Sequence, residues 1–320
     1  MLVIRGFETP PKEALGSVVA IGNFDGVHRG HQVLIQNTRQ IAKQKGRLAG
    51  TIVFEPHPRE FFTPDTPHFR LTTLSEKQRL FALYDLDLTI VLDFNEELAK
   101  LSAEEFIKNV LIDRLAVSHV VVGYDFSFGK GRTGTVDTLE KAGRKFGFGV
   151  TIVPAQSAQN SGTNEVYSSS RIRELLIAGD VEKAATALGH WWRVKGTVIK
   201  GAKVGTGIGF PTANIAMPPG TGLAHGIYAV RVYVDQKRHK AAAYFGTRPT
   251  IDNGAPILEV TLFDFNSDLY TKELSIEFIA HVRADKSFPS LDLLKKQIDE
   301  DCQNVREILA RAGENPVESA

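Results

Sequence analysis

The sequence predicts an α/β domain followed by an all-β domain that one helix closes. In the first half, short apolar runs alternate with helical stretches, which is typical of a doubly wound parallel sheet covered on both faces. In the second half, apolar runs follow one another across turns with no helix between them, as in a small antiparallel barrel or sandwich. A chain of 320 residues has room for two such cores.

The first half contains the apolar runs that we expect to form the parallel sheet. They lie at residues 17–21, 50–54, 88–92, 119–122 and 150–153. Helical patterns separate them, for example at residues 75–84 and 103–115, and a further helix is expected around residues 173–188. Ligands of such sheets bind beyond the carboxyl ends of the strands, so the residues that follow each run are candidate site residues.

The second half predicts strands at residues 192–199, 226–234, 240–245, 257–263 and 274–280. Alternation within residues 228–234 predicts a sheet with one buried face. Apolar residues at helical spacing between 291 and 309 predict the closing helix. We therefore expect a first domain at residues 1–187, a second at 188–312, and a disordered tail at 313–320.

Length and composition fit an intracellular enzyme. The net charge is +1, so no general attraction to nucleic acid or to an anionic membrane is expected. The single cysteine, Cys302, excludes an intrachain disulfide and a cysteine metal cluster. The first residues carry no secretory signal pattern, and no apolar run is long enough for a membrane span. We expect a cytoplasmic protein.

Residues 20–31 are the most informative stretch, and they read Ala-Ile-Gly-Asn-Phe-Asp-Gly-Val-His-Arg-Gly-His. An apolar run ends in a glycine turn and a helical pattern follows, which leaves backbone N–H groups free to bind phosphate. His28 and His31 add two side-chain donors at the same place. Two unrelated loop histidines would be the simpler explanation, but the surrounding residues disfavour it. The stretch predicts a site for a nucleoside triphosphate.

Residues 167–176 are a second candidate for phosphate binding. Ser168, Ser169 and Ser170 precede an apolar-periodic run, where serines are good helix caps. That structural explanation does not account for Arg171 and Arg173 in the first turn, because the helix dipole disfavours cations there. An anion bound at the helix start would account for them.

These stretches resemble a known enzyme family. The string Gly-x-Phe-Asp-Gly-x-His-x-Gly-His resembles the adenylyl-transfer motif of the nucleotidyltransferase superfamily. Together with residues 55–59, 122–129 and 167–176, it is similar to the bacterial bifunctional riboflavin kinase/FAD synthetases. That family usually has Thr where this chain has Ser170, and Tyr124 is not the residue expected in its loop. The resemblance implies an N-terminal nucleotidyltransferase-like domain that adenylylates FMN with ATP, releasing pyrophosphate.

The resemblance also implies the roles of residues in this first domain. His28 and His31 would be catalytic, stabilising charge at the α-phosphorus. ATP and its phosphates would be bound by Gly22, Phe24, Asp25, Gly30, Ser168, Ser169, Ser170 and Arg171. The flavin or substrate loops would contribute His57, Pro58, Arg59, Asp125 and Phe126.

Residues 205–214 carry the second signal, Gly-Thr-Gly-Ile-Gly-Phe-Pro-Thr-Ala-Asn. This is not a Walker A loop, and the nearest candidate, residues 129–131, lacks the required Ser or Thr. The Pro-Thr-Ala-Asn segment is similar to the signature of the riboflavin kinase barrel, which implies a riboflavin-kinase-like barrel here. The implied ATP-binding residues are Lys203, Gly205, Gly209, Pro211, Thr212 and Asn214.

Within that barrel the resemblance implies a metal site and a base. Thr212 and Asn214 would hold Mg²⁺ through oxygen ligands. Glu259 would be the general base that accepts the proton of the ribityl 5′-hydroxyl. From the residues alone, Glu259 could equally be a solvent-facing side chain on the outside of a barrel.

Several positions of the second domain depart from the family pattern. Residues 200–202 are Lys-Gly-Ala where His-Gly-Asp is common, and Val204 and Thr206 replace residues that are commonly basic. Tyr244 and Phe245 stand where Asn-Ile is usual. Thr212, Asn214 and Glu259 are unchanged, so we expect altered affinity rather than lost activity.

The resulting hypothesis is a bifunctional enzyme that makes FMN from riboflavin and FAD from FMN. Its ligands would be riboflavin, FMN, FAD, ATP, ADP and pyrophosphate, with Mg²⁺ and no tightly bound redox cofactor. Flavoproteins would be its clients. The competing hypotheses are an enzyme with one active module, a flavin sensor without turnover, and a nucleotidyltransferase for another substrate. Retention of Glu259 argues against the sensor, and the kinase-like second domain argues against the third alternative.

Overall fold

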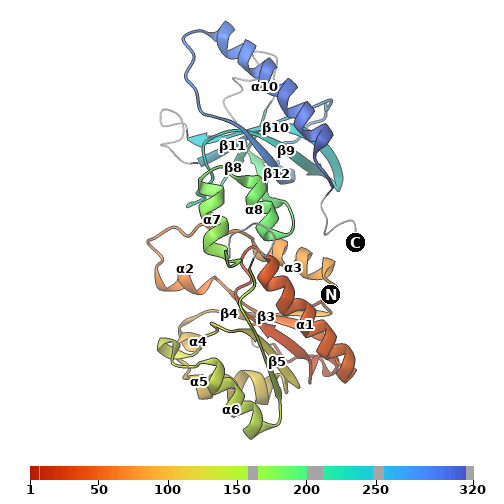
Figure 1. The fold of residues 1–320 in the computed structure, drawn as a ribbon, viewed down its shortest axis with the longest axis vertical. Coiled ribbons are helices and arrows are strands. Elements are labelled where there is room, and N and C mark those ends of the chain that lie inside the picture. Colours follow the sequence, from red (N-terminus) through yellow and green to blue (C-terminus); the bar gives the residue numbers. More distant parts are fainter. Residues whose placement is uncertain (7, 158–164, 200–211, 219, 248–255, 315–320) are drawn as a thin grey trace. The chain divides into compact units, whose positions relative to one another are not determined.

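The computed structural model describes residues 1–6, 8–157, 165–199, 212–218, 220–247 and 256–314. Its contacts divide the chain into two compact units (Figure 1). The first unit comprises residues 1–66 and 73–168, and the second comprises residues 67–72 and 169–320. None of the helices in the described ranges is both long and apolar enough to cross a membrane.

The first unit is built on a six-stranded parallel sheet with the strand order β1-β4-β3-β2-β5-β6. All five predicted runs are strands of this sheet. The edge strand β1 was not predicted, because only Ile4 of its four residues is buried. The strands are β1 (Leu2–Arg5), β2 (Val18–Ile21), β3 (Ala49–Glu55), β4 (Leu88–Asp93), β5 (His119–Gly123) and β6 (Gly149–Val153).

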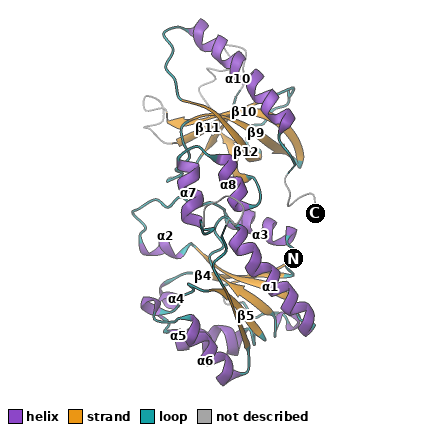
Figure 2. Cartoon of the chain, in the orientation of Figure 1, coloured by secondary structure: helices purple, strands orange, loops and turns teal. Residues whose placement is uncertain are grey.

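Helices cover both faces of this sheet, which confirms the doubly wound class (Figure 2). One apolar cluster joins α1 and α3 to the sheet face that carries Val18, and another joins α5, η2 and α6 to the face that carries Val19. The α-helices are α1 (Arg29–Lys45), α2 (Pro58–Phe62), α3 (Leu74–Leu83), α4 (Glu96–Lys100), α5 (Ala103–Phe106) and α6 (Val136–Phe146). The other helical elements are η1 (Lys12–Ala14), the π-helix η2 (Ile107–Arg114) and η3 (Lys130–Arg132).

The strand order places a topological switch point at the centre of the sheet. The chain runs outward from β2 to β3 and β4 and then returns to β5, which pairs with β2 in parallel. Ligands of open α/β sheets bind outside the carboxyl ends of the strands at such a point. The residues that follow β2, β3 and β5 therefore share the edge of the sheet that suits a ligand.

The second unit contains a closed antiparallel barrel with the strand order β10-β11-β8-β7-β12-β9. The sequence predicted either a barrel or a sandwich for this unit, and the structure is a barrel. β8 was not predicted, because its four residues are too few to show a period and its first two overlap the segment interpreted as a binding motif. The strands are β7 (Trp192–Ile199), β8 (Ala213–Ala216), β9 (Gly226–Val234), β10 (Lys237–Thr247), β11 (Pro256–Leu262) and β12 (Glu273–Ala284).

Two short helices precede the barrel where one helix was expected. α7 (Ser169–Ile177) and α8 (Val181–Leu188) are separated at Gly179, whose φ of +81° is left-handed and suits glycine. Their apolar residues belong to the same buried cluster as the barrel interior. Residues 67–72 join this unit through the Trp192 indole, which donates to the Leu71 carbonyl at 2.9 Å.

The closing helix α10 (Leu291–Arg311) covers part of the outer face of the barrel. The prediction that residues 228–234 have one buried face is therefore wrong. Ala229 lies against Val305 and Leu309 of the helix, and Arg231 is only 5% exposed. Arg231 Nη2 donates to the carbonyls of Ala312 and Gly313 at 3.0 and 2.8 Å, which satisfies acceptors that follow the helix.

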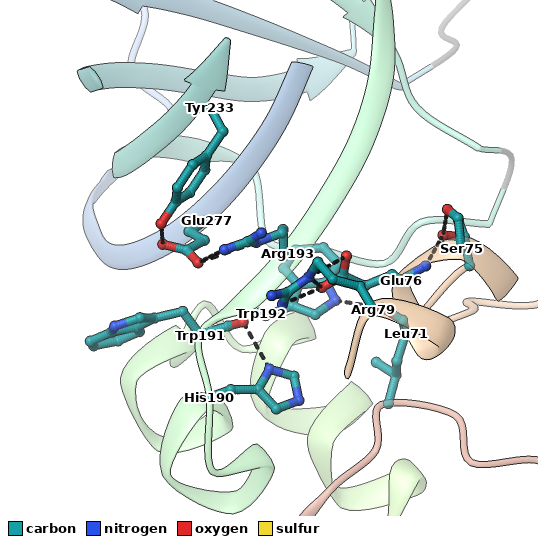
Figure 3. Close-up of polar contacts among 11 residues, drawn as sticks. Leu71, Ser75, Glu76, Arg79, His190, Trp191, Trp192, Arg193, Tyr233 and Glu277 are labelled. Carbon is teal, nitrogen blue, oxygen red and sulfur yellow. Dashed lines mark hydrogen bonds and ion pairs between the residues drawn. The ribbon is translucent and has the colours of Figure 1, made fainter. Parts of the chain in front are cut away.

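A buried ion pair ties two barrel strands together (Figure 3). Glu277 on β12 is fully buried and is the register partner of Arg193 on β7. Arg193 Nε donates to its Oε1 at 3.2 Å, and the Tyr233 hydroxyl donates to Oε2 at 3.1 Å. The Arg193 guanidinium also lies 4.4 Å from the centre of the Tyr233 ring. Both carboxylate oxygens thus have a partner, as burial of a charge requires.

Candidate functional site

The turn between β2 and α1 has an unusual backbone. Phe24 and Val27 have φ values of +49° and +43°, and Gly26 between them has +85°. The left-handed region is costly for a β-branched residue such as Val27. Strain of this kind persists where the surrounding fold holds it, and it is frequent at ligand sites. The turn leads directly to His28, which is the N-cap of α1.

His28 and His31 form one compact pair. The backbone N–H of His31 donates to His28 Nδ1 at 3.4 Å, and the two rings stack with centroids 3.6 Å apart and planes 23° apart. A Cβ atom at Gly30 would lie 3.2 Å from the His28 ring and 3.6 Å from the Tyr167 carbonyl. Glycine at this position therefore lets the segment that leads to Ser168 pass close to the histidine pair.

The fold lowers the pKa of the His31 imidazole. Burial, the nearby His28 and then the positive charge of Lys77 hold its pKa well below the ordinary value of 6.5. Its Nδ1 atom is buried and has no hydrogen-bond partner among the described residues. A polyanion bound beside the ring would favour the charged form and would raise this pKa.

Lys77 is a neighbour of this site that the sequence analysis missed. It lies on α3 and is 1% exposed, and one turn later Phe81 packs edge-on against Phe24 with centroids 5.4 Å apart. Phe24 in turn contacts the His31 ring at 5.1 Å. The sequence could have indicated it, because Lys77 lies three and four residues before Leu80 and Phe81 and so shares their apolar helix face.

Other predicted residues of the first unit follow β2 and the two strands beside it. Asp25, in the β2–α1 turn, is 2% exposed. His57 follows β3 and is the N-cap of α2, where its Nδ1 accepts from the Arg59 N–H at 3.1 Å, with Pro58 at the first helical position. Phe126 follows β5 and stacks on Phe128 at 5.3 Å. His57 and Phe126, with Asp125, come after the strands on either side of β2.

The serines and arginine of the second phosphate motif fall at the division between the units. Ser168 ends the first unit, whereas Ser169, Ser170 and Arg171 begin α7 in the second. Arg171 Nη1 pairs with Glu174 at 3.2 Å. Arg173 Nε donates to the Phe69 carbonyl at 2.6 Å, so this arginine has a structural role that requires no anion.

In the barrel, Asn214 and Glu259 are brought together. They are register partners on β8 and β11. The residues that flank each of them along its own strand belong to the barrel core, Ala213 and Ile215 beside Asn214 and Leu258 and Val260 beside Glu259. Both therefore project from the outer face. Asn214 is 5% exposed, and its Oδ1 has no hydrogen-bond partner within the described part of the chain. An orphaned amide oxygen, two residues after the Thr212 hydroxyl, fits the oxygen ligands that Mg²⁺ prefers.

Four predicted ATP-binding residues lie outside the described residues. They are Lys203, Gly205, Gly209 and Pro211.

Comparisons with known proteins match both halves of the chain. The FAD synthetase family model matches residues 11–170, and the riboflavin kinase model matches residues 188–309. A bifunctional riboflavin kinase/FMN adenylyltransferase of Pseudomonas fluorescens is 38% identical over 311 residues, covering 97% of this chain and 98% of the relative. The Escherichia coli K12 protein of the same description is 37% identical, covering 96% and 97%.

One solved structure matches nearly the whole chain. It is described as a macrolide-efflux protein from Streptococcus pneumoniae, and it superposes with a TM-score of 0.82 at 27% identity, over 96% of this chain and 99% of that one. The two curated relatives match at higher identity over a similar share of the chain, and they are described by flavin activities.

Proposed function

The chain belongs to the bifunctional riboflavin kinase/FMN adenylyltransferase family, and we propose from this premise that it makes FMN from riboflavin and FAD from FMN. The observation that carries the proposal is that the chain holds two separate sets of groups suited to phosphate chemistry. One is the histidine pair at the switch point of the sheet. The other is the pairing of Asn214 with Glu259 on the barrel.

In the first unit, the reaction is attack of an FMN phosphate oxygen on the α-phosphorus of ATP. The new P–O bond forms while the bond to the β-phosphate oxygen breaks, and pyrophosphate leaves. His28 and His31 donate hydrogen bonds to the triphosphate as negative charge develops. The buried cation of Lys77 adds to the same field. The family resemblance assigns the outer phosphates to Ser168, Ser169, Ser170 and Arg171, the last three of which belong to the second unit.

In the barrel, the reaction is transfer of the γ-phosphoryl group to the ribityl 5′-hydroxyl. Glu259 accepts the hydroxyl proton as the oxygen bonds to phosphorus, and ADP leaves. Thr212 and Asn214 would hold Mg²⁺, which neutralises phosphate charge when it is bound. Positioning supplies much of the remaining rate enhancement, because the protein contributes little covalent chemistry.

The module boundary at residues 187 and 188 is part of the proposal. The two family models support it, since the FAD synthetase model ends at residue 170 and the riboflavin kinase model begins at residue 188. α7 and α8 lie between them and pack with the barrel core. Of the predicted tail at 313–320, residues 315–320 lie outside the described residues.

A cytoplasmic location is also proposed, because both steps consume ATP. The FAD would pass to flavoprotein clients. No nucleic acid or membrane partner is proposed.

A time course of product formation tests this function. The full chain is incubated with riboflavin, ATP and magnesium, and the flavins are separated by chromatography. We expect FMN first and FAD afterwards. FMN without FAD would contradict the role of the first unit, and FAD only from supplied FMN would contradict the role of the barrel. No flavin product from either substrate would refute the proposal.

A further inference from the structure

The histidine pair of the first unit has room for one extra proton but not for two. The rings of His28 and His31 stack with their centroids 3.6 Å apart and their planes 23° apart. Like charges within a few ångströms disfavour each other's charged form, so the two rings do not carry positive charge together. Lys77 on α3 adds a further positive charge that acts on the His31 ring.

The cap of α1 determines which ring can receive the proton. His28 Nδ1 accepts the hydrogen bond of the His31 backbone N–H at 3.4 Å, and this bond caps the helix start. A neutral imidazole that accepts through Nδ1 carries its own proton on Nε2. A further proton on His28 would enter at Nδ1 and end the cap. His31 Nδ1, in contrast, is buried and has no hydrogen-bond partner among the described residues, so protonation of this ring breaks no bond at that atom.

The surroundings of His31 disfavour its proton until an anion arrives. Burial comes first among the causes of its lowered pKa, followed by His28 in its own turn and Lys77 on α3. Asp25 and Arg29, the other charged residues of the turn and helix start, have opposite charges. A triphosphate at this helix start would bring several negative charges, which favour the charged form of a neighbouring imidazole.

We propose that the first unit takes up one proton from the solvent when it binds ATP, and that His31 receives it. This inference rests on the proposed function, because it requires the triphosphate to lie at the histidine pair. The protonated ring has two N–H donors and a positive charge, which is the form best suited to stabilise charge at the α-phosphorus. The proton returns to the solvent when pyrophosphate leaves, so the overall reaction is unchanged.

This uptake makes the affinity for ATP fall as the pH rises. Below the pKa of the ligand-free protein, His31 is protonated with or without ATP, and above the pKa of the complex it is protonated in neither. Between these two values, each pH unit weakens binding by up to about tenfold, because one proton enters with the nucleotide. The KM for ATP in FAD formation should therefore rise with pH in that window.

Calorimetry in buffers of different ionisation enthalpy counts the protons. Mg·ATP is titrated into the full chain at pH 6.5 without flavin, and the slope of binding heat against buffer ionisation enthalpy gives the number taken up. The wild-type chain should take up roughly one proton more than His31→Gln. Any ATP that binds at the barrel contributes equally to both proteins, so the difference between them reports on the first unit.

His119→Gln is the matched control. Burial and then Lys45 lower the pKa of His119 as well, but His119 is the first residue of β5 and lies at the edge of the sheet away from the carboxyl ends of the strands. Its replacement should leave the proton uptake at the wild-type value. Equal slopes for the wild-type chain and His31→Gln would overturn the proposal, and so would a loss of uptake in His119→Gln.

A second measurement needs no variant and remains decisive if His31→Gln does not fold. The KM for ATP is measured between pH 6 and pH 8, with magnesium in excess, for FAD formation from FMN and for riboflavin phosphorylation. Both reactions use the same nucleotide, so its own ionisation affects them equally. We expect the KM in FAD formation to rise more steeply with pH, by up to about tenfold per unit. The same pH dependence in both reactions would overturn the proposal.

These measurements distinguish the inference from the proposed function. FAD formation without proton uptake on ATP binding would refute the inference and leave the function standing. Proton uptake that depends on His31 in a chain that forms no FAD would support the inference and refute adenylyl transfer. A first unit that binds no ATP would overturn both.

Discussion

Replacing His31 by glutamine should change how the stability of the first unit depends on pH. The unfolded chain protonates His31 near its ordinary pKa of 6.5, whereas burial, His28 and Lys77 keep the folded pKa well below that value. As pH falls below 6.5, the unfolded state therefore binds a proton that the folded state does not. Stability that is present above pH 6.5 is lost, by about 1.4 kcal/mol for each pH unit, until the folded pKa is reached.

Urea denaturation between pH 5 and pH 7 measures this effect. The wild-type chain should lose stability more steeply than His31→Gln as the solution becomes acidic, by a difference close to that slope. At pH 7 and above, the two pH dependences should run parallel. Identical pH dependence over the whole range would refute the reasoning, because it would mean that His31 binds its proton equally well in the folded protein.

The same variant has a predicted effect on catalysis. Loss of one charge-stabilising donor typically costs roughly 10²–10³ in turnover. His31→Gln should therefore slow FAD formation from FMN by this factor while riboflavin phosphorylation continues. Undiminished FAD formation would contradict the role of the histidine pair.

Three further predictions concern the barrel. Glu277→Ala leaves Arg193 buried without this carboxylate and should lower the free energy of unfolding by about 3–5 kcal/mol, measured by denaturation. The control is Glu273→Gln on the same strand, which breaks a 3.9 Å ion pair with Lys195. Because the Glu273 side chain is 67% exposed, this change should cost below about 1 kcal/mol. Equal losses would contradict the importance of burial. Glu259→Gln should slow FMN formation roughly 10²–10⁴-fold without affecting FAD formation from FMN, and normal riboflavin phosphorylation would exclude it as the base. Asn214→Ala should raise the magnesium concentration for half-maximal kinase activity, whereas an unchanged requirement would exclude Asn214 as a ligand.

The strands of both units could be predicted where an apolar run is bounded by turns. The runs at residues 192–199 and 226–234 match β7 and β9 residue for residue. β1 and β8, with four residues each, are too short to show a period. The burial of Ala229 and Arg231 depends on α10, which packs on them from more than 60 residues away in the chain. Such long-range packing has no local signal.

The candidate sites could be predicted only where their residues are close together in the sequence. The histidine pair lies within one turn and one helix start, so its sequence spacing fixes its geometry. Lys77 reaches the same site from another helix and carries only a weak local signal. The pairing of Glu259 with Asn214 follows from strand register, which the sequence does not display. Arg173 illustrates the opposite error, since a partner 104 residues away explains a charge that the sequence assigned to an anion.

Mixing two variants, each impaired at a different one of the two sites, tests most directly whether one chain carries two independent sites. Glu259→Gln alone should leave riboflavin unchanged, and His31→Gln alone should accumulate FMN. Together, with riboflavin, ATP and magnesium, they should form FAD, because FMN made by the second variant is adenylylated by the first. A different result is that the mixture forms no FAD even though Glu259→Gln still adenylylates supplied FMN and His31→Gln still makes FMN. That result would contradict release of FMN between the sites. FAD from either variant alone at the wild-type rate would contradict the assignment of its altered residue.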